Sequence, residues 1–356
     1  MTRSSLFGVY IHIPFCHHKC DYCAFATWVD KESLIEAYVD ALITDIERTM
    51  PDLPVVDTVF VGGGTPSLIP AQMLTKALSA LQLSENSEVT VECNPDDVTL
   101  DLMRTYVEGG VNRISLGVQS MVPHVLQKLG RTHNPENVRR AVQNAREAGI
   151  GSINLDIIYG AVNESVDDWR LTVQAAVQLK PDHVSAYGLT VEAGTGLAQR
   201  PDDYPNDDDQ ADKYLIANEL LENTGLLNYE ISNWAKPGHE CRHNQMYWGQ
   251  GNYRGFGCAA HSHHDGRRWW NVRTPERYID CVTRNISTET AGETLDDATR
   301  KREALELAIR TREGVPASAL PVKDLGDLVE QHGDHVVLTV RGRLLANEIS
   351  LRLENG

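Results

Sequence analysis

Strand-like and helix-like segments alternate six times in the first half of this 356-residue chain. Helical periodicity fills the intervals, for example over residues 135–148, which end before Gly149. Strands that alternate with helices indicate a parallel sheet, and parallel sheets carry function at the carboxyl ends of their strands. The short apolar runs that we expect to be strands are residues 9–13, 58–61, 88–92, 113–117, 152–158 and 183–187.

Six strand–helix units are too few to close an eight-stranded barrel. We therefore expect an α/β fold with an open, partial (β/α)6 barrel, and a doubly wound open sheet is the alternative. The barrel should span residues 1–225 and include a cysteine-bearing loop. Residues 226–290 read as a connecting region rich in aromatic residues and His, which we expect to hold a haem or substrate site, and residues 228–275 within it lack periodicity and are expected to be irregular.

The last part of the chain, residues 291–356, reads as a separate small module. Helical periodicity predicts a helix over residues 298–311 and a shorter one over residues 325–332. A strand is expected over residues 336–340, before a last helical run. This order predicts a small helical, winged-helix-like C-terminal module.

The charge balance argues against a nucleic-acid partner. The chain has 33 Lys and Arg against 50 Asp and Glu, a formal charge of −17, which would repel a phosphate backbone. We see no signal peptide and no apolar run long enough to span a membrane. The seven cysteines are scattered and odd in number, which is typical of a reducing compartment. We therefore expect a cytoplasmic protein.

Three cysteines on one short loop carry the strongest chemical signal. Cys16, Cys20 and Cys23 have the spacing C-x3-C-x2-C directly after the first predicted strand. Three thiolates can hold three irons of a [4Fe–4S] cluster and leave the fourth iron open. S-adenosylmethionine (SAM) is the molecule whose radical chemistry uses such an iron. A zinc-stabilised binding protein is the alternative. The candidates for a fourth zinc ligand are His12, His17 and His18.

Polar groups gather at the predicted ends of other strands. Gly63, Gly64 and Thr65 follow the second strand and offer backbone groups to a ligand's amino-acid head, although a plain tight turn explains them too. A buried carboxylate needs a partner, which is either a ligand or Arg131 in a structural salt bridge. The other polar side chains near strand ends are Tyr10, Glu92, Gln119 and Asp156.

These motifs together resemble radical SAM enzymes. The resemblance is closer to the branch that holds oxygen-independent coproporphyrinogen III oxidase and its HemW-type haem-chaperone relatives. It implies a partial TIM-type radical SAM barrel, a [4Fe–4S] cluster on the three cysteines, and SAM. The runs that carry the resemblance are residues 12–25, 62–67, 92–95, 112–120, 129–131 and 154–160. The residues implied to line the SAM site are Tyr10, Tyr22, Gly63, Gly64, Thr65, Glu92, Gln119, Arg131 and Asp156.

Two departures separate this chain from the oxidases of that branch. Phe25 stands where the oxidases have a fourth cysteine. Only 15 residues precede Cys16, whereas the oxidases carry a longer segment ahead of the cluster. The resemblance therefore favours a chaperone that binds haem and delivers it to an apo-haemoprotein. Oxidative decarboxylation of coproporphyrinogen III is the alternative activity, and we assign no catalytic residue.

A second motif lies in the region that we expect to be irregular. Residues 243–248 resemble the H-N-x-x-Y-W signature of the haem-chaperone relatives, whose histidine is implicated in haem binding. Imidazole is a common axial ligand of haem iron, so His243 is our candidate ligand, and a hydrogen-bonded structural histidine is the alternative. The partners expected are haem and an apo-haemoprotein, with peripheral contact to a membrane-bound acceptor left open. The alternative ligands are Cys241, His261, His263 and His264.

Overall fold

The computed structural model describes residues 6–353 and is organised by one twelve-stranded sheet. Its central strands are parallel and follow one another in chain order, so all six predicted strands are confirmed. These strands are β1 (Phe7–Ile13), β2 (Val56–Gly63), β3 (Leu83–Cys93), β4 (Arg113–Gln119), β5 (Ser152–Tyr159) and β6 (His183–Gly188).

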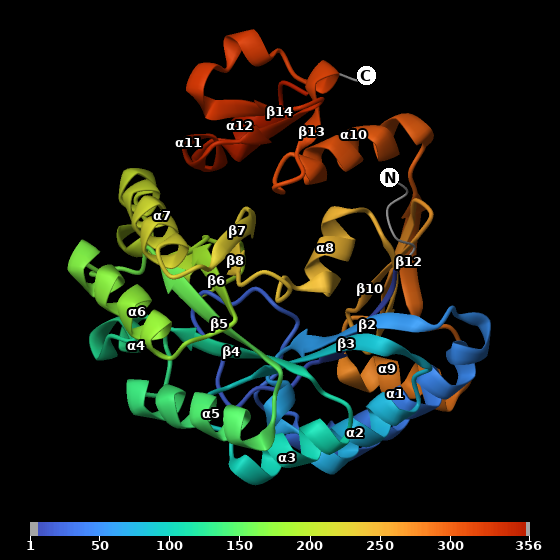
Figure 1. Cartoon of the computed structure of the whole chain (residues 1–356). Coiled ribbons are helices and arrows are strands. Elements are labelled where there is room, and N and C mark those ends of the chain that lie inside the picture. Colours follow the sequence, from blue (N-terminus) through green and yellow to red (C-terminus); the bar gives the residue numbers. More distant parts are fainter. Residues whose placement is uncertain (1–5, 354–356) are drawn as a thin grey trace.

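The connecting helices lie outside the curved sheet (Figure 1). Alternate strand residues bury against them: Val9 and Ile11 of β1 have no exposed surface, while Tyr10 between them faces the interior of the barrel. Local signals set the helix ends, since Ser165 forms a capping box and Gly149 ends its helix with φ of 95°. The helices are α1 (Ile35–Thr49), α2 (Ala71–Ser79), α3 (Leu100–Glu108), α4 (Pro123–Lys128), α5 (Pro135–Ala148) and α6 (Val166–Gln178).

Short strands extend this core at both edges, so the expectation of an irregular stretch over residues 228–275 is wrong. At one edge, β8 (Asn233–Ala235) and β7 (Leu227–Glu230) add antiparallel beyond β6. At the other, β9 (Asn252–Phe256) runs parallel to β1. The antiparallel strands that continue from β9 are β10 (His261–His264), β11 (Arg267–Asn271) and β12 (Glu289–Thr294). Pairing with a sheet edge stabilises these strands, and local periodicity does not encode such pairing.

The sheet ends at β12 and β7, which do not pair with each other, so the barrel is open as predicted. Helix α8 (Arg242–Trp248) lies between the two edges, on the concave side of the sheet (Figure 1). Two further helices, α7 (Asp207–Glu222) and α9 (Pro275–Thr283), pack against α6 and α1 respectively. No helix among residues 6–353 is long and apolar enough to cross a membrane.

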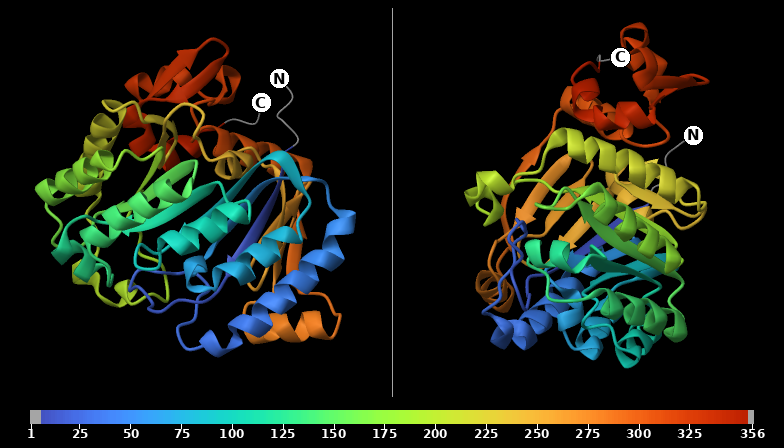
Figure 2. Two further views of the ribbon diagram at one scale, coloured as in Figure 1. Left: turned by 60° about the horizontal axis from the view of Figure 1, so that its bottom comes forward. Right: turned by 90° about the vertical axis from the view of Figure 1, so that its left-hand side faces the viewer.

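The C-terminal residues form a separate lobe with its own small core (Figure 2). Its sheet has the order β13-β15-β14. The helix predicted over residues 325–332 is wrong: a 3-10 turn, Gly326–Leu328, leads into β14 there. Gly333, with φ of 66°, closes a hairpin that pairs β14 with β15. The elements are α10 (Asp297–Ala308), β13 (Val315–Pro316), β14 (Val329–His332), β15 (His335–Leu338), α11 (Val340–Leu344) and α12 (Ala346–Ser350).

Candidate functional site

A cavity of about 560 Å³ opens at the carboxyl ends of the parallel strands. The cysteine loop after β1, the glycine turn after β2 and the ends of β3 to β6 surround it. The sequence-predicted site residues that line it are Cys16, Cys20, Tyr22, Cys23, Gly63, Gly64, Thr65, Glu92, Gln119, Arg131 and Asp156. Tyr10 lies inside the barrel but outside this lining, with its hydroxyl 3.1 Å from Nδ1 of His12.

The cysteine loop presents three free thiols to the cavity. Thr65 donates to Sγ of Cys16 at 3.5 Å, and Arg131 donates to Sγ of Cys20 at 3.7 Å. Burial raises the pKa of the Cys16 and Cys23 thiols, so these groups hold their protons until a metal displaces them. The three side chains therefore suit a metal cluster whose ligands come from one loop.

The turn after β2 approaches the cysteine loop so closely that only glycine fits. A Cβ on Gly64 would lie 2.5 Å from the carbonyl oxygen of Phe15 and 3.1 Å from Sγ of Cys16. Gly63 has φ of 110°, and a Cβ there would lie 2.4 Å from the ring of His12. The two glycines therefore let the backbone of this turn lie against His12 and the cysteine loop.

Two carboxyl groups lie at the floor of the cavity with different numbers of partners. Glu92 accepts one hydrogen bond, from the amide of Gly63 at 3.1 Å. Burial, and then the charge of Asp156, raises the pKa of Glu92 to about 7. Asp156 accepts from Ser115 at 2.6 Å and from Asn154 at 2.8 Å; burial raises its pKa, and these bonds oppose that shift. Glu92 therefore has spare acceptor capacity for a cationic ligand group.

Arg131 and Gln119 complete the polar lining. Arg131 donates to the carbonyl of Gly117 at 3.1 Å, and no ion pair in the described part of the chain joins it to Glu92 or Asp156. The structural salt bridge considered from sequence is therefore absent there. Gln119 ends β4 with φ of 62°, a left-handed conformation that a residue other than glycine adopts at some cost. Such strain is concentrated at functional sites in proteins.

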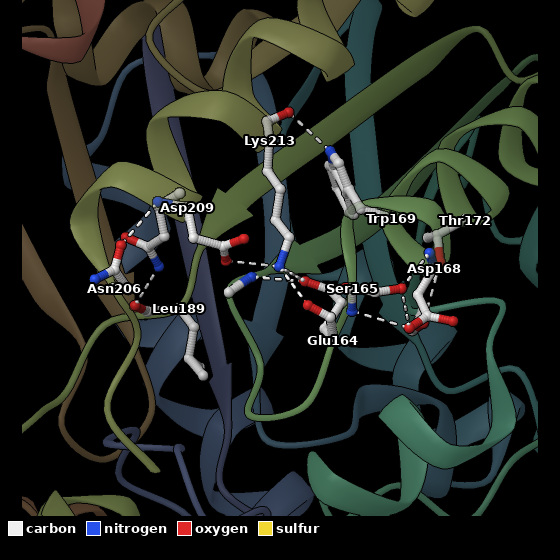
Figure 3. A network of polar contacts seen from close by, with 12 residues as sticks. Glu164, Ser165, Asp168, Trp169, Thr172, Leu189, Asn206, Asp209 and Lys213 are labelled. Carbon is white, nitrogen blue, oxygen red and sulfur yellow. Dashed lines mark hydrogen bonds and ion pairs between the residues drawn. The ribbon is translucent and has the colours of Figure 1, made fainter. Parts of the chain in front are cut away.

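An ion triad joins α7 to the connection after β5, with the Lys213 and Glu164 side chains buried and Asp209 partly exposed (Figure 3). Nζ of Lys213, on α7, lies 3.1 Å from Glu164 and 2.7 Å from Asp209. Glu164 belongs to the connection after β5, and its side chain and that of Lys213 have no exposed surface. On the same helix Gln210 donates to the carbonyl of Leu189, which lines the cavity, at 2.9 Å. Sequence analysis missed this triad, because nothing local links residue 213 with residue 164.

His243 lies away from this cavity, on α8, and is fully buried. Its Nδ1 is 2.9 Å from the hydroxyl of Thr58, and its Nε2 is 2.9 Å from that of Tyr247. The ring stacks on Phe60 with centroids 5.5 Å apart. Burial lowers the pKa of His243 to about 3, so the imidazole is neutral. Both nitrogens have partners in this conformation.

Glu88 is a second residue that sequence analysis missed. Its carboxylate accepts from the backbone amides of Arg242 and His243 at 3.0 and 3.1 Å, so it caps the first turn of α8. A signal was available, since Glu88 lies four residues before Glu92 on β3 and a strand repeats its faces every two residues. Both carboxylates therefore point into the barrel.

The alternative haem ligands differ in accessibility. His261, on β10, is exposed and stacks on Trp270 with centroids 5.6 Å apart. His264 is also exposed and lies beside Asp265. His263 is buried, and its Nδ1 is 2.9 Å from the carbonyl oxygen of Gly251. Cys241 has no exposed surface.

The open sheet, the cysteine loop and the cavity above it together define the class of radical SAM proteins. A family model described as "Radical SAM superfamily" matches residues 10–176, from β1 into α6. Among solved structures, coproporphyrinogen III oxidase (HemN) from Escherichia coli, titled a radical SAM enzyme, has a TM-score of 0.85 at 23% identity. The match covers 98% of this chain and 89% of that one, and it shows a shared fold.

Similarity to curated proteins identifies the family within this superfamily. Heme chaperone HemW of Mycobacterium tuberculosis is 39% identical over 96% of this chain and 93% of its own length. HemW of Bacillus subtilis is 33% identical over 96% of this chain and 97% of its own length. HemW of Escherichia coli is 39% identical over 78% of this chain and 77% of its own length. The chain belongs to the HemW family of the radical SAM superfamily.

Proposed function

We propose that this protein binds haem and delivers it to apo-haemoproteins, with a [4Fe–4S] cluster and SAM in the cavity at the strand ends. The proposal rests on near full-length similarity to proteins named heme chaperones. The observation that carries it in the structure is the set of three free thiols on one loop, beside a cavity with spare acceptors.

Cys16, Cys20 and Cys23 would hold the cluster, and Gly63, Gly64, Thr65 and the polar lining would hold SAM. When bound, the cluster supplies an open iron for SAM and one electron for its cleavage. Glu92 would accept a cationic group of SAM, because its one hydrogen bond leaves acceptor positions free. Thr65 and Arg131 already donate toward the sulfurs of Cys16 and Cys20 and would stabilise them as thiolates.

The zinc alternative has less support from the geometry. A single zinc ion needs converging ligands. Both ring nitrogens of His12 have partners, the hydroxyl of Tyr10 and the carbonyl of Ala26. Metal analysis after anaerobic purification tests this point, and zinc without acid-labile sulfide would overturn our proposal.

His243 is our proposed haem ligand because the family signature marks it. Ligation through Nε2 requires the hydroxyl of Tyr247 to withdraw, so haem binding should move α8 or the Tyr247 ring. The His243→Ala variant should bind haem more weakly and with a shifted Soret band. His261→Ala is the matched comparison, because His261 is an exposed alternative that stacks on an aromatic ring. A Soret change in His261→Ala alone would reassign the ligand.

Anaerobic haem titration, with and without SAM, tests the function directly. Haem-loaded protein is then mixed with an apo-haemoprotein, and we expect the acceptor's absorption spectrum to develop. Incubation with coproporphyrinogen III, SAM and a reductant is the counter-test, since sustained turnover to protoporphyrinogen IX would overturn the chaperone proposal. All seven cysteines are free, which supports action in a reducing cytoplasm.

A further inference from the structure

A continuous chain of hydrogen bonds joins the floor of the cavity to the start of α8. The amide of Cys241, the N-cap residue of α8, donates to the hydroxyl of Tyr229 at 3.2 Å. That hydroxyl lies 2.7 Å from Nε2 of His183, and Nδ1 of His183 lies 2.6 Å from Oδ1 of Asn154. The amide nitrogen of Asn154 donates to Asp156 at 2.8 Å. Four hydrogen bonds thus span the barrel interior.

The chemistry of the groups sets one direction for the whole chain. A backbone amide only donates, so the Tyr229 hydroxyl accepts from Cys241 and has its own proton free for His183. The Oδ1 of Asn154 only accepts, so Nδ1 of His183 carries the imidazole proton. Burial lowers the pKa of His183 well below its ordinary value, consistent with one neutral tautomer. Every donor therefore points toward Asp156, and such bonds polarise one another.

Only one end of this chain meets open space. Cys241, His183, Tyr229 and Asn154 are each at most 2% exposed, whereas Asp156 lines the cavity. Water therefore has no access to replace a bond that shifts in the middle of the chain. A ligand group that donates to the free acceptor positions of Asp156 changes the strength of the hydrogen bond that Asp156 accepts from Asn154. Because water does not reach the chain, that change is passed on to the neighbouring hydrogen bonds of the protein.

We propose that His183 and Tyr229 are positioning residues that couple occupancy at Asp156 to the placement of α8. The inference rests on the proposed function, because it assumes SAM at Asp156 and haem beside His243. It adds that SAM changes the affinity for haem, and by thermodynamic reciprocity haem changes the affinity for SAM to the same extent. A coupling of about 5-fold or more is typical of such linked sites.

The test compares two variants that each lose one buried hydroxyl. Tyr229→Phe breaks the chain, whereas Tyr278→Phe removes a buried hydroxyl of α9 that donates to Asp45 on α1, outside the chain. The readout is amide hydrogen exchange of residues 241–248 in the cluster-loaded full chain, with and without SAM. We expect SAM to change exchange several-fold in the wild type and in Tyr278→Phe. In Tyr229→Phe we expect no response, with SAM affinity within about twofold.

The outcomes separate the two proposals. SAM binding without any exchange response of α8 in the wild type overturns this inference and leaves the proposed function intact, as does a full response in Tyr229→Phe. Absence of SAM binding in the wild type overturns both. Haem titration gives a second readout, in which the SAM-dependent ratio of affinities falls to one in Tyr229→Phe. If that variant does not fold, His183→Gln interrupts the same chain one residue nearer the cavity.

Discussion

Two glutamates on the same strand show how the two ends of the barrel differ. Glu88 and Glu92 lie four residues apart on β3 and face the same interior. Glu88 accepts from two backbone amides of α8 and from the thiol of Cys241, its N-cap residue. Glu92 accepts one amide, and burial raises its pKa to about 7. Glu88, which accepts several hydrogen bonds, stabilises the start of α8. Glu92, which has free acceptor positions, faces the cavity.

The same contrast separates the two metal-binding candidates. The thiols of Cys16, Cys20 and Cys23 are free and line a cavity. His243 is fully buried, with both ring nitrogens within hydrogen-bond distance of hydroxyl groups. The cysteine loop can bind its ligand with little rearrangement. His243 must first lose a hydrogen bond, so binding there requires a conformational change.

Loss of one loop cysteine should prevent cluster binding if the cavity holds the proposed cluster. Cys20→Ser removes one of three thiolate ligands, and we expect bound iron and labile sulfide to fall below about a tenth of the wild-type content. Iron and sulfide analysis after anaerobic reconstitution measures this. Cys281→Ala, which changes a buried cysteine of α9, is the matched control and should keep the full cluster. Wild-type iron content in Cys20→Ser would show that the cavity is not the cluster site.

The contact between α7 and the connection after β5 should depend on the ion triad. Lys213→Met leaves the carboxylate of Glu164 buried without its cation, and we expect the free energy of unfolding to fall by about 3–5 kcal/mol. Adding Glu164→Gln removes the unpaired charge and should recover part of the loss. Chemical denaturation of the three proteins measures this. If Lys213→Met alone is neutral, the buried pair does not hold this contact.

Glutamine at positions 88 and 92 should have opposite effects on stability. Glu88→Gln replaces one acceptor oxygen by a donor against the amides of α8, and we expect a loss of about 1–3 kcal/mol. Glu92→Gln should stabilise the ligand-free protein above pH 7. The folded pKa of Glu92 lies above its ordinary 4.5, so wild-type stability falls as pH rises from 4.5 to about 7. Denaturation at pH 5 and pH 8 measures both.

SAM affinity provides the complementary pH test. If the ionised form of Glu92 binds a cationic group of SAM, affinity should rise by up to about tenfold per pH unit below pH 7 and level off above it. Calorimetric titration of the cluster-loaded protein between pH 6 and pH 8 measures the profile. Glu92→Gln should bind weakly with a flat profile. A flat wild-type profile would mean that Glu92 does not change protonation on binding.

The smallest effect should come from Tyr247. Tyr247→Phe frees Nε2 of His243, at a cost of about 0.5–1.5 kcal/mol in stability for the lost hydrogen bond. If His243 ligates haem, affinity for haem should increase a few-fold, because no contact has to break first. Absorbance titration measures this, with Tyr253→Phe, an aromatic neighbour of Tyr247, as control. Weaker haem binding in Tyr247→Phe would argue that the hydroxyl itself contributes to the site.

Local patterns were sufficient for the parallel core and the cavity. Each predicted strand was an apolar run followed by a helix signal, and both features depend on neighbouring residues. The cysteine spacing and the glycine turn placed their residues at strand ends, and the structure brings them to one cavity. The strands over residues 227–271 were missed because they form only against the edges β6 and β1, which are distant in sequence.

The sequence by itself determined that three thiols lie on one loop, because three cysteines within eight positions stay together in any fold. Only the tertiary structure decided which polar groups are free and which already have partners. Glu88 reaches α8 across 155 positions, and Thr58 reaches His243 across 185. Hydrogen bonds over such separations depend on how the sheet curves around α8, and no local pattern in the chain encodes that curvature.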